Sequence, residues 1–229
     1  MNILKQISYD IWCLIKLFLF FMLDQIIASL IVWQQTQHLP SLMLKRWYFV
    51  FYLTSFVIIA FMLWRYYRQL HNHNYEKYRP HWPNWHDVKI IISGLLSIFI
   101  MEIALNILSI HLHVQTANDS ANQQMVNQLT QGNPQAMFWF GVIFAPIMEE
   151  LIFRGFFFNY FFKHMHGKSA LLAIIIDGCI FGCMHEQTHF MSWLVYAILG
   201  CILATCYYRS KNIYVSMSVH ILNNLIASI

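Results

Sequence analysis

Long apolar runs separated by short polar segments dominate the chain. Seven runs are long enough for a helix to cross a hydrocarbon core, which takes roughly 20 residues. They cover approximately residues 11–33, 47–66, 88–112, 137–162, 169–187, 190–207 and 213–229. The pattern predicts an all-α fold, a polytopic transmembrane helix bundle with about seven spans.

Composition supports the same class of protein. Of the 229 residues, 59% are hydrophobic and only 10% are charged, more apolar surface than one soluble domain can cover. The first run is long and contains Lys16 and Asp24, and no small-residue cleavage site follows it. We therefore expect a membrane anchor there, not a cleavable signal peptide.

Lysine and arginine are unevenly distributed over the connecting segments, and they resist translocation. Segment 114–135, on the other side of the membrane from the segments rich in these residues, contains neither lysine nor arginine. Only Lys45 and Arg46 lie on the side where few basic residues are expected. We expect a multi-pass protein of the cell membrane with a cytoplasmic N-terminus and an outer C-terminus. The segments after the second, fourth and sixth runs contain Arg65, Arg68, Lys77, Arg79, Lys89, Lys163, Lys168, Arg209 and Lys211.

The net charge of +4 thus follows mostly from membrane topology. Basic residues interleaved with aromatic residues, the pattern typical of nucleic-acid binding, do not occur as a patch in the sequence. We expect membrane lipid and a peptide or membrane-protein substrate as partners, and no nucleic acid.

The most polar intramembrane segment is APIMEELIFRG, residues 145–155. Glu150 and Arg154 are four residues apart, so they share a helix face as an ion pair. Glu149 is rotated by about 100° and lacks that partner. Pro146 removes one helix hydrogen bond and is expected to free the carbonyl of Val142 and kink the helix. The segment alone fits either a structural ion pair with a spare carboxylate or a reactive glutamate.

Two later runs add imidazole and amide groups at helical spacing. Phe181 and His185 are four residues apart, as are His220 and Asn224. A single intramembrane histidine is more often a helix-helix hydrogen bonder than a catalyst. Three helices that offer a carboxylate, an imidazole, and an imidazole with an amide together supply groups that activate water and stabilise an oxyanion.

These motifs, E-E-x-x-x-R, F-x-x-x-H and H-x-x-x-N in that order, resemble the CPBP family of intramembrane proteases, named for CAAX proteases and bacteriocin-processing enzymes. Ala145-Pro146 and Phe153-Arg154-Gly155 are also similar to the family. The resemblance covers roughly residues 137–229, which would form the protease core. Residues 1–136 would form N-terminal transmembrane helices without motifs, within one integral membrane unit.

The resemblance implies a role for each motif residue. Glu149 would be the general base and would share a water molecule with His185. His220 and Asn224 would stabilise the oxyanion of the tetrahedral intermediate. Structural support would come from Glu150 with Arg154, which brace the helix, and from Phe181.

A second protease pattern overlaps the first. His185-Glu186-Gln187-Thr188-His189 fits H-E-x-x-H, in which both histidines bind zinc and Glu186 is the base. These residues run from an apolar segment into a turn, and a third ligand is unassigned. The donor set of the three motifs could also hold a divalent ion, but we expect no metal and no other cofactor.

Two carboxylates depart from the family pattern. Asp177 and Glu102 lie within predicted spans, and we expect each to be packed and paired. A proton-coupled transporter would also use intramembrane carboxylates, but no inverted repeat is found.

We expect an intramembrane endopeptidase that acts on a membrane-associated or small peptide substrate, such as a bacteriocin or signalling peptide precursor. The motif residues do not separate these substrates. A non-catalytic membrane immunity protein on the same scaffold is the alternative.

Overall fold

The computed structural model describes residues 3–37, 39–113, 121–162 and 165–228. All regular structure in this part of the chain is helical, and six helices are long and apolar enough to cross a membrane. A shorter apolar helix, Ile213–Ala227, follows them. The predicted multi-pass helical bundle is therefore confirmed.

The long helices extend the predicted apolar runs by a few residues, mostly at polar ends. Asn84 is the N-cap of the third helix, where it accepts hydrogen bonds from the backbone of His86 and Asp87. The membrane-crossing candidates and the shorter helix comprise α1 (Ile3–Gln35), α2 (Ser41–Asn72), α3 (Trp85–Leu112), the fourth span Pro134–Phe161, α8 (Lys168–His185), α9 (Phe190–Ser210) and α10 (Ile213–Ala227).

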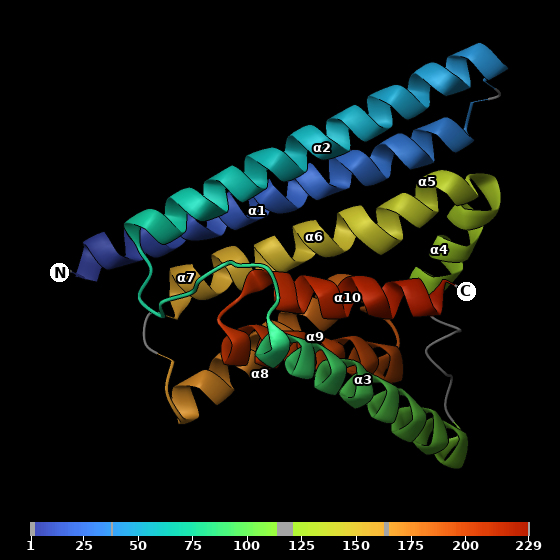
Figure 1. The fold of residues 1–229 in the computed structure, drawn as a ribbon. Coiled ribbons are helices and arrows are strands. Elements are labelled where there is room, and N and C mark those ends of the chain that lie inside the picture. Colours follow the sequence, from blue (N-terminus) through green and yellow to red (C-terminus); the bar gives the residue numbers. More distant parts are fainter. Residues whose placement is uncertain (1–2, 38, 114–120, 163–164, 229) are drawn as a thin grey trace.

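Figure 1 shows that the fourth span lies in the middle of the bundle. The antiparallel pair α1 and α2 packs along one side of this span, and α10 packs on the other. Beyond α10 lie α9, α8 and α3, with α8 packed closely against α9. The three helices that carry the motifs thus meet in the interior.

The fourth span is not a uniform α-helix. Within it, α5 (Pro134–Trp139), α6 (Ala145–Glu150) and α7 (Phe158–Phe161) are joined by the π-helical segments Phe140–Phe144 and Leu151–Phe157. These wider turns flank the glutamates, and π-helical turns are frequent at functional sites.

Pro146 has a different effect on the backbone than the one expected. The amide of Ala145 bonds the carbonyl of Phe140, an i→i−5 pattern. In that register the acceptor that loses its donor at Pro146 is the carbonyl of Gly141, not Val142. The prediction for Val142 assumed α-helical spacing, which does not hold at this turn.

One helix falls in a segment for which no helix was expected. Ala121–Gly132 forms the amphipathic α4, within the polar segment 114–135. The carbonyl of Leu129 in α4 accepts a hydrogen bond from the amide of Gln35 at 2.6 Å. Residues 114–120 of this segment lie outside the described residues.

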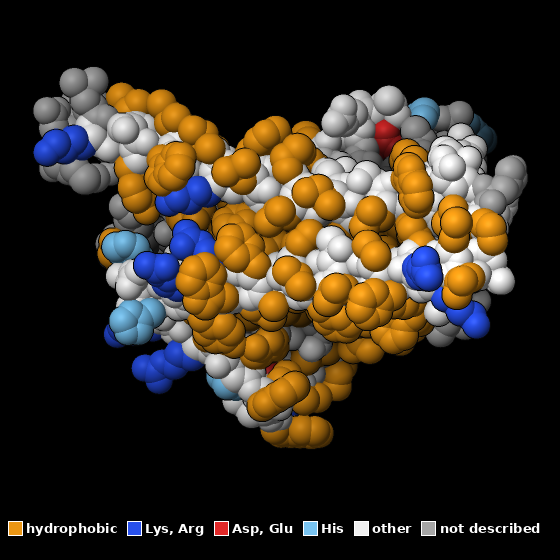
Figure 2. Space-filling view, turned by 90° about the horizontal axis from the view of Figure 1, so that it is seen from above, with side chains coloured by type: hydrophobic (Ala, Val, Ile, Leu, Met, Phe, Trp, Pro, Cys, Tyr) orange, Lys and Arg blue, Asp and Glu red, His pale blue; other side chains and the backbone are white. Residues whose placement is uncertain are grey.

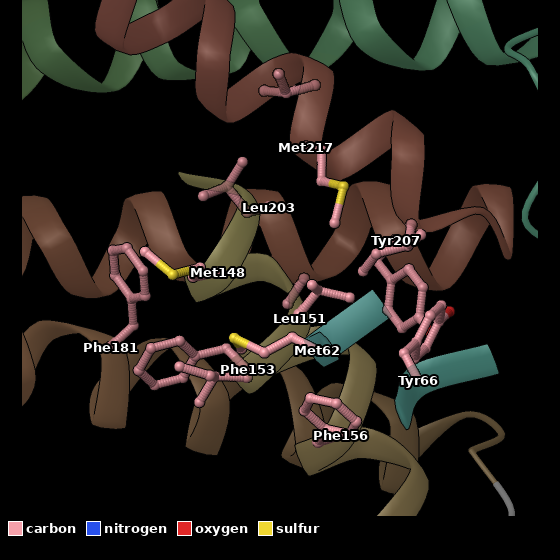
Figure 3. Packing of buried hydrophobic residues seen from close by; sticks show 14 of the residues in the cluster. Met62, Tyr66, Met148, Leu151, Phe153, Phe156, Phe181, Leu203, Tyr207 and Met217 are labelled. Atoms are coloured by element: carbon pink, nitrogen blue, oxygen red, sulfur yellow. The ribbon is translucent and has the colours of Figure 1, made fainter. Parts of the chain in front are cut away.

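The interior is filled mainly by aromatic residues, isoleucine and methionine. Figure 3 shows Met148, Leu151 and Phe156 of the fourth span among side chains of neighbouring helices. The outer surface is also hydrophobic. Figure 2 shows that large apolar side chains form a broad band over α1 and α2. Such a band fits hydrocarbon as the surrounding solvent.

Glycine allows α8 and α9 to approach each other closely. A Cβ placed on Gly178 would lie 2.5 Å from the backbone oxygen of Ala197 and 2.3 Å from Sγ of Cys201. On the facing helix, a Cβ on Gly200 would lie 2.9 Å from Cα of Gly178. Small residues allow such contact between membrane helices.

Candidate active site

Two histidines converge on one carboxylate oxygen. Nε2 of His185 lies 3.7 Å from Oε2 of Glu149, and Nε2 of His220 lies 3.8 Å from the same atom. The side chains of Glu149 and His185 are 18% and 21% exposed, whereas that of His220 is 4% exposed. Glu149 therefore faces a partly accessible space bordered by α6, α8 and α10.

The other ring nitrogen of each histidine has a fixed partner. Nδ1 of His185 lies 2.9 Å from the backbone oxygen of Phe181, and Nδ1 of His220 lies 3.0 Å from Oε1 of Glu150. A carbonyl only accepts hydrogen bonds, and so does an ionised carboxylate, so each Nδ1 is the donor. In the neutral imidazole the Nε2 atoms then carry the lone pairs, and both face Glu149.

Aromatic packing holds the ring of His185 in place. The ring is stacked between Phe181 at 4.2 Å and Tyr196 at 4.8 Å, measured between centroids. Phe181 is fully buried and also contacts Phe153 edge to face at 5.2 Å. The spacing of Phe181 and His185, one turn apart on α8, places the motif phenylalanine directly beneath the imidazole.

Arg154 is completely buried and joins three helices. Its Nη1 donates to Oε1 of Glu150 at 3.1 Å, and its Nη2 donates to the backbone oxygen of Gly200 at 2.7 Å. Nε lies 3.2 Å from Oδ2 of Asp177, an ion-pair distance without the alignment of a hydrogen bond. The guanidinium also lies 4.9 Å from the ring centre of Phe181.

This buried cluster explains the different tasks of the two adjacent glutamates. Oε1 of Glu150 accepts from both Arg154 and His220, so Glu150 connects the arginine to the histidine. Glu149, one residue earlier, faces the space between the imidazoles. The expected ion pair of Glu150 with Arg154 is present, and Asp177 is the packed and paired carboxylate that the sequence indicated.

The expectation for Glu102 is wrong. Its side chain lies on an exposed face of α3, and no salt bridge to it is found among the described residues. The reason is that α3 packs only along one side, against α9 and α10, so its other side faces outward.

Asn224 lies one helical turn beyond His220 and is hydrogen-bonded to the fourth span. Its Nδ2 donates to the backbone oxygen of Gly141 at 2.8 Å. This is the acceptor that Pro146 leaves without a backbone donor in the π-helical register. One amide hydrogen of Asn224 thus fixes α10 against the helix that carries Glu149, and the amide has a second hydrogen.

A further carboxylate was not among the predicted site residues. Asp24 on α1 is only 5% exposed and interacts electrostatically with Glu149. Its Oδ2 accepts from Gln25 at 3.0 Å. The signal was available in the sequence, because Asp24 lies in the apolar stripe with Phe20 and Ile27, which are both buried. A charged residue at such a position faces neighbouring helices.

The alternative zinc-protease reading fails on local structure. Helix α8 ends at His185, and Glu186 has an extended backbone, so His185 and His189 do not share a helix face. Among the described residues, no group of three or more His, Cys, Asp and Glu forms a metal-binding cluster. The five residues of the H-E-x-x-H pattern therefore run from a helix end into a turn, which is not the single helix that the zinc-protease pattern requires.

Glu186 instead organises the turn between α8 and α9. Its Oε1 accepts from the backbone amides of Gln187, Thr188 and His189 at 2.9, 2.7 and 3.3 Å, and from the hydroxyl of Thr188 at 2.5 Å. Burial raises the pKa of Glu186, but these hydrogen bonds outweigh it and hold the pKa below its usual range.

The comparisons with known proteins fall on the same region. Residues 131–226 match the family model described as type II CAAX prenyl endopeptidase Rce1-like. UPF0177 protein YvdC of Lactococcus lactis subsp. lactis (strain IL1403) is 33% identical over 147 residues, which are 63% of this chain and 52% of that protein. The "Putative membrane peptidase YdiL" of Bacillus subtilis (strain 168) is 30% identical over 106 residues, 46% of this chain and 41% of that protein.

The chain thus spans about half the length of the curated relatives that it matches. No solved structure gives a significant match. The matched region contains all three motifs, so the similarity to the Rce1-like family model over residues 131–226 confirms the resemblance seen in the sequence.

Proposed function

We propose that the protein is an intramembrane endopeptidase that uses Glu149 to activate water. The observation that carries the proposal is the convergence of two histidine Nε2 atoms on one oxygen of Glu149, at 3.7 and 3.8 Å. These separations are too long for direct hydrogen bonds and fit a water molecule held among the three side chains. Each ring is oriented through its Nδ1, so the Nε2 positions are fixed before substrate binds.

In the proposed reaction Glu149 accepts a proton from water while the oxygen attacks the scissile carbonyl carbon. The resulting tetrahedral intermediate has an oxyanion, which His220 and the second amide hydrogen of Asn224 stabilise. His220 donates from Nε2 in its imidazolium form, in which Nδ1 still donates to Glu150. Glu149 then delivers its proton to the leaving amine, which completes hydrolysis.

The substrate class follows from the surroundings of the site. Glu149 lies within a membrane-spanning helix, so the scissile bond must reach that depth. We propose a membrane-associated or small peptide substrate, such as a bacteriocin or signalling peptide precursor. The protein would act in the cell membrane with its N-terminus in the cytoplasm, the orientation that the distribution of lysine and arginine favours.

Cleavage of a candidate peptide by purified variants tests the proposal. Glu149→Gln keeps the shape of the side chain but cannot accept the proton, so turnover should fall to background. Glu186→Gln and His189→Ala are matched controls in the neighbouring turn and should remain active. Size-exclusion chromatography checks folding.

Two outcomes would contradict the proposal. An active Glu149→Gln variant would exclude Glu149 as the base. Wild-type protein that binds a peptide which an Rce1-like protease cleaves, but never hydrolyses it, would favour a non-catalytic immunity protein on the same scaffold.

A further inference from the structure

A second polar site lies away from Glu149, at the membrane end where α1, α2 and α7 meet. It is a cavity of about 250 Å³ whose lining includes Lys16, Arg65, Arg68, Gln69 and Tyr160. No aspartate or glutamate is among the described residues that line it. We call it the basic pocket.

One face of α2 supplies most of the polar groups. Arg65, Arg68, Gln69 and Asn72 follow the i, i+3, i+4, i+7 spacing of a single helix face. Lys16 of α1 faces them, with its Nζ 5.5 Å from the ring centre of Tyr160. The helices thus direct three cationic side chains into one cavity.

Those cations lack an internal counter-charge. Among the described residues, no carboxylate forms a salt bridge with Lys16, Arg65 or Arg68. The contacts found for their charged groups are aromatic: Lys16 with Trp12 at 5.3 Å, and both arginines with Trp64 at 5.7 and 5.5 Å. Like charges repel one another, so an anion in the cavity would stabilise the arrangement.

Gln69 is a second, independent indication of a ligand. Both polar atoms of its side chain, Nε2 and Oε1, are buried and have no hydrogen-bond partner among the described residues. Burying such a group without a partner is unfavourable, because it loses its hydrogen bonds to water. An amide donates through Nε2 and accepts through Oε1, so it suits a ligand with phosphate oxygens and a neighbouring hydroxyl.

The position of the basic pocket matches the lipid headgroup layer. α2 has 32 residues and is about 48 Å long at ~1.5 Å per residue, longer than the ~30 Å hydrocarbon core. Trp12, Trp64 and Tyr67 are exposed and lie close in the sequence to the residues that line the pocket. Aromatic residues are enriched at membrane interfaces in the same way. Figure 2 shows lysine and arginine side chains gathered at the same end of the apolar band as the N-terminus.

From these observations we infer that the basic pocket binds the phosphate headgroup of an anionic phospholipid. Lys16, Arg65 and Arg68 neutralise the phosphate, and Gln69 bonds the headgroup. A cavity of this size has room for a phosphodiester, since a single water needs only ~10–15 Å³. The lipid would join α1 and α2 to Tyr160, at the end of the span that carries Glu149.

Thermal unfolding in detergent, with added phosphatidylglycerol or phosphatidylcholine, tests the inference. Phosphatidylglycerol should raise the Tm of wild-type protein, and phosphatidylcholine should not. Arg65→Gln/Arg68→Gln should need about tenfold to thirtyfold more phosphatidylglycerol for the same shift, at ~1 kcal/mol per basic residue. The matched control is Lys45→Gln/Arg46→Gln, which removes two exposed charges from the opposite end of the same helix and should respond like wild type.

Three results would overturn the inference. An equal response to phosphatidylcholine would remove the need for an anionic headgroup. Equal protection by inorganic phosphate would make the ligand a soluble anion. If the double variant responds to phosphatidylglycerol like wild type, the stabilisation comes from the general charge of the surface and not from Arg65 and Arg68.

If the double variant does not fold, Gln69→Leu replaces it, because this change keeps all three charges and removes the amide. It should weaken the response to phosphatidylglycerol about tenfold, and an unchanged response counts against the pocket. The readout is independent of proteolysis, so a protein without peptidase activity still tests the inference.

Discussion

Replacing Arg154 by methionine should destabilise the protein more than any change at its surface. Methionine has a similar volume but cannot donate to Glu150 or to the carbonyl of Gly200, and it cannot form the ion pair with Asp177. Glu150 retains the hydrogen bond from His220, but Asp177, which has no hydrogen-bond partner among the described residues, would lose its ion pair with the arginine. Two fully buried carboxylates would then lack their shared cation.

Removal of one partner from a buried ion pair costs about 3–5 kcal/mol. For a chain of this size ~1 kcal/mol corresponds to ~2–4 °C in Tm, so the loss should be about 6–20 °C. The assay is tryptophan fluorescence during heating in detergent. Arg46→Met is the control, because it removes an exposed arginine from α2, and its Tm should stay within ~2 °C of wild type.

A double variant separates the charge effect from loss of packing. Adding Asp177→Asn to Arg154→Met removes one of the two unpaired charges, so part of the lost stability should return. A Tm of Arg154→Met equal to that of wild type would refute the bracing role. If the double variant is no more stable than Arg154→Met, the unpaired charge of Asp177 does not contribute to the loss of stability.

Three further predictions concern other parts of the structure. In the proposed mechanism Asn224→Ala removes one oxyanion donor, so it should lower turnover by about 10²–10³ with little change in KM, and a change confined to KM would refute that role. Gly178→Ala should lower Tm by several degrees, because its Cβ would lie 2.5 Å from a backbone oxygen of α9, whereas Gly141→Ala, with nothing within 4 Å of its Cβ, should not. Glu186→Gln should lower Tm at pH 7. Because the folded pKa of Glu186 lies below its usual value, the stability that it supplies is present above the usual pKa of ~4.3 and is lost as pH falls through the lowered folded pKa. The Tm difference from wild type should therefore narrow on acidification, and a constant difference would contradict the assignment.

The helices could be predicted from the sequence because each is determined by the apolar composition of its own segment. A run of apolar residues must form a helix in lipid to satisfy its backbone, so the spans could be found from hydropathy alone. The i, i+4 spacings likewise placed Glu150 with Arg154, and Phe181 beneath His185, since both pairs depend on a single helix.

What the sequence did not predict depends on contacts between helices. The proximity of Asp24 to Glu149 requires the packing of α1 on the fourth span, and the outward position of Glu102 depends on which side of α3 is covered. The π-helical turns could not be expected from Pro146 alone. The carbonyl of Gly141 in this segment accepts a hydrogen bond from the amide of Asn224, which comes from another part of the chain.

The π-helical turn Phe140–Phe144 has a consequence for how relatives of this protein are recognised. A π turn holds about one residue more than an α turn, so deleting one residue there would restore α-helical winding and rotate everything before Ala145 by about 100°. The letters E-E-x-x-x-R, F-x-x-x-H and H-x-x-x-N would remain intact, yet Gly141 would turn away from Asn224 and α10 would lose its hold on the fourth span. A homologue could therefore contain all three motifs and still lack the hydrogen bond between Asn224 and Gly141, so the length of the segment before the glutamates is a further criterion when relatives are compared.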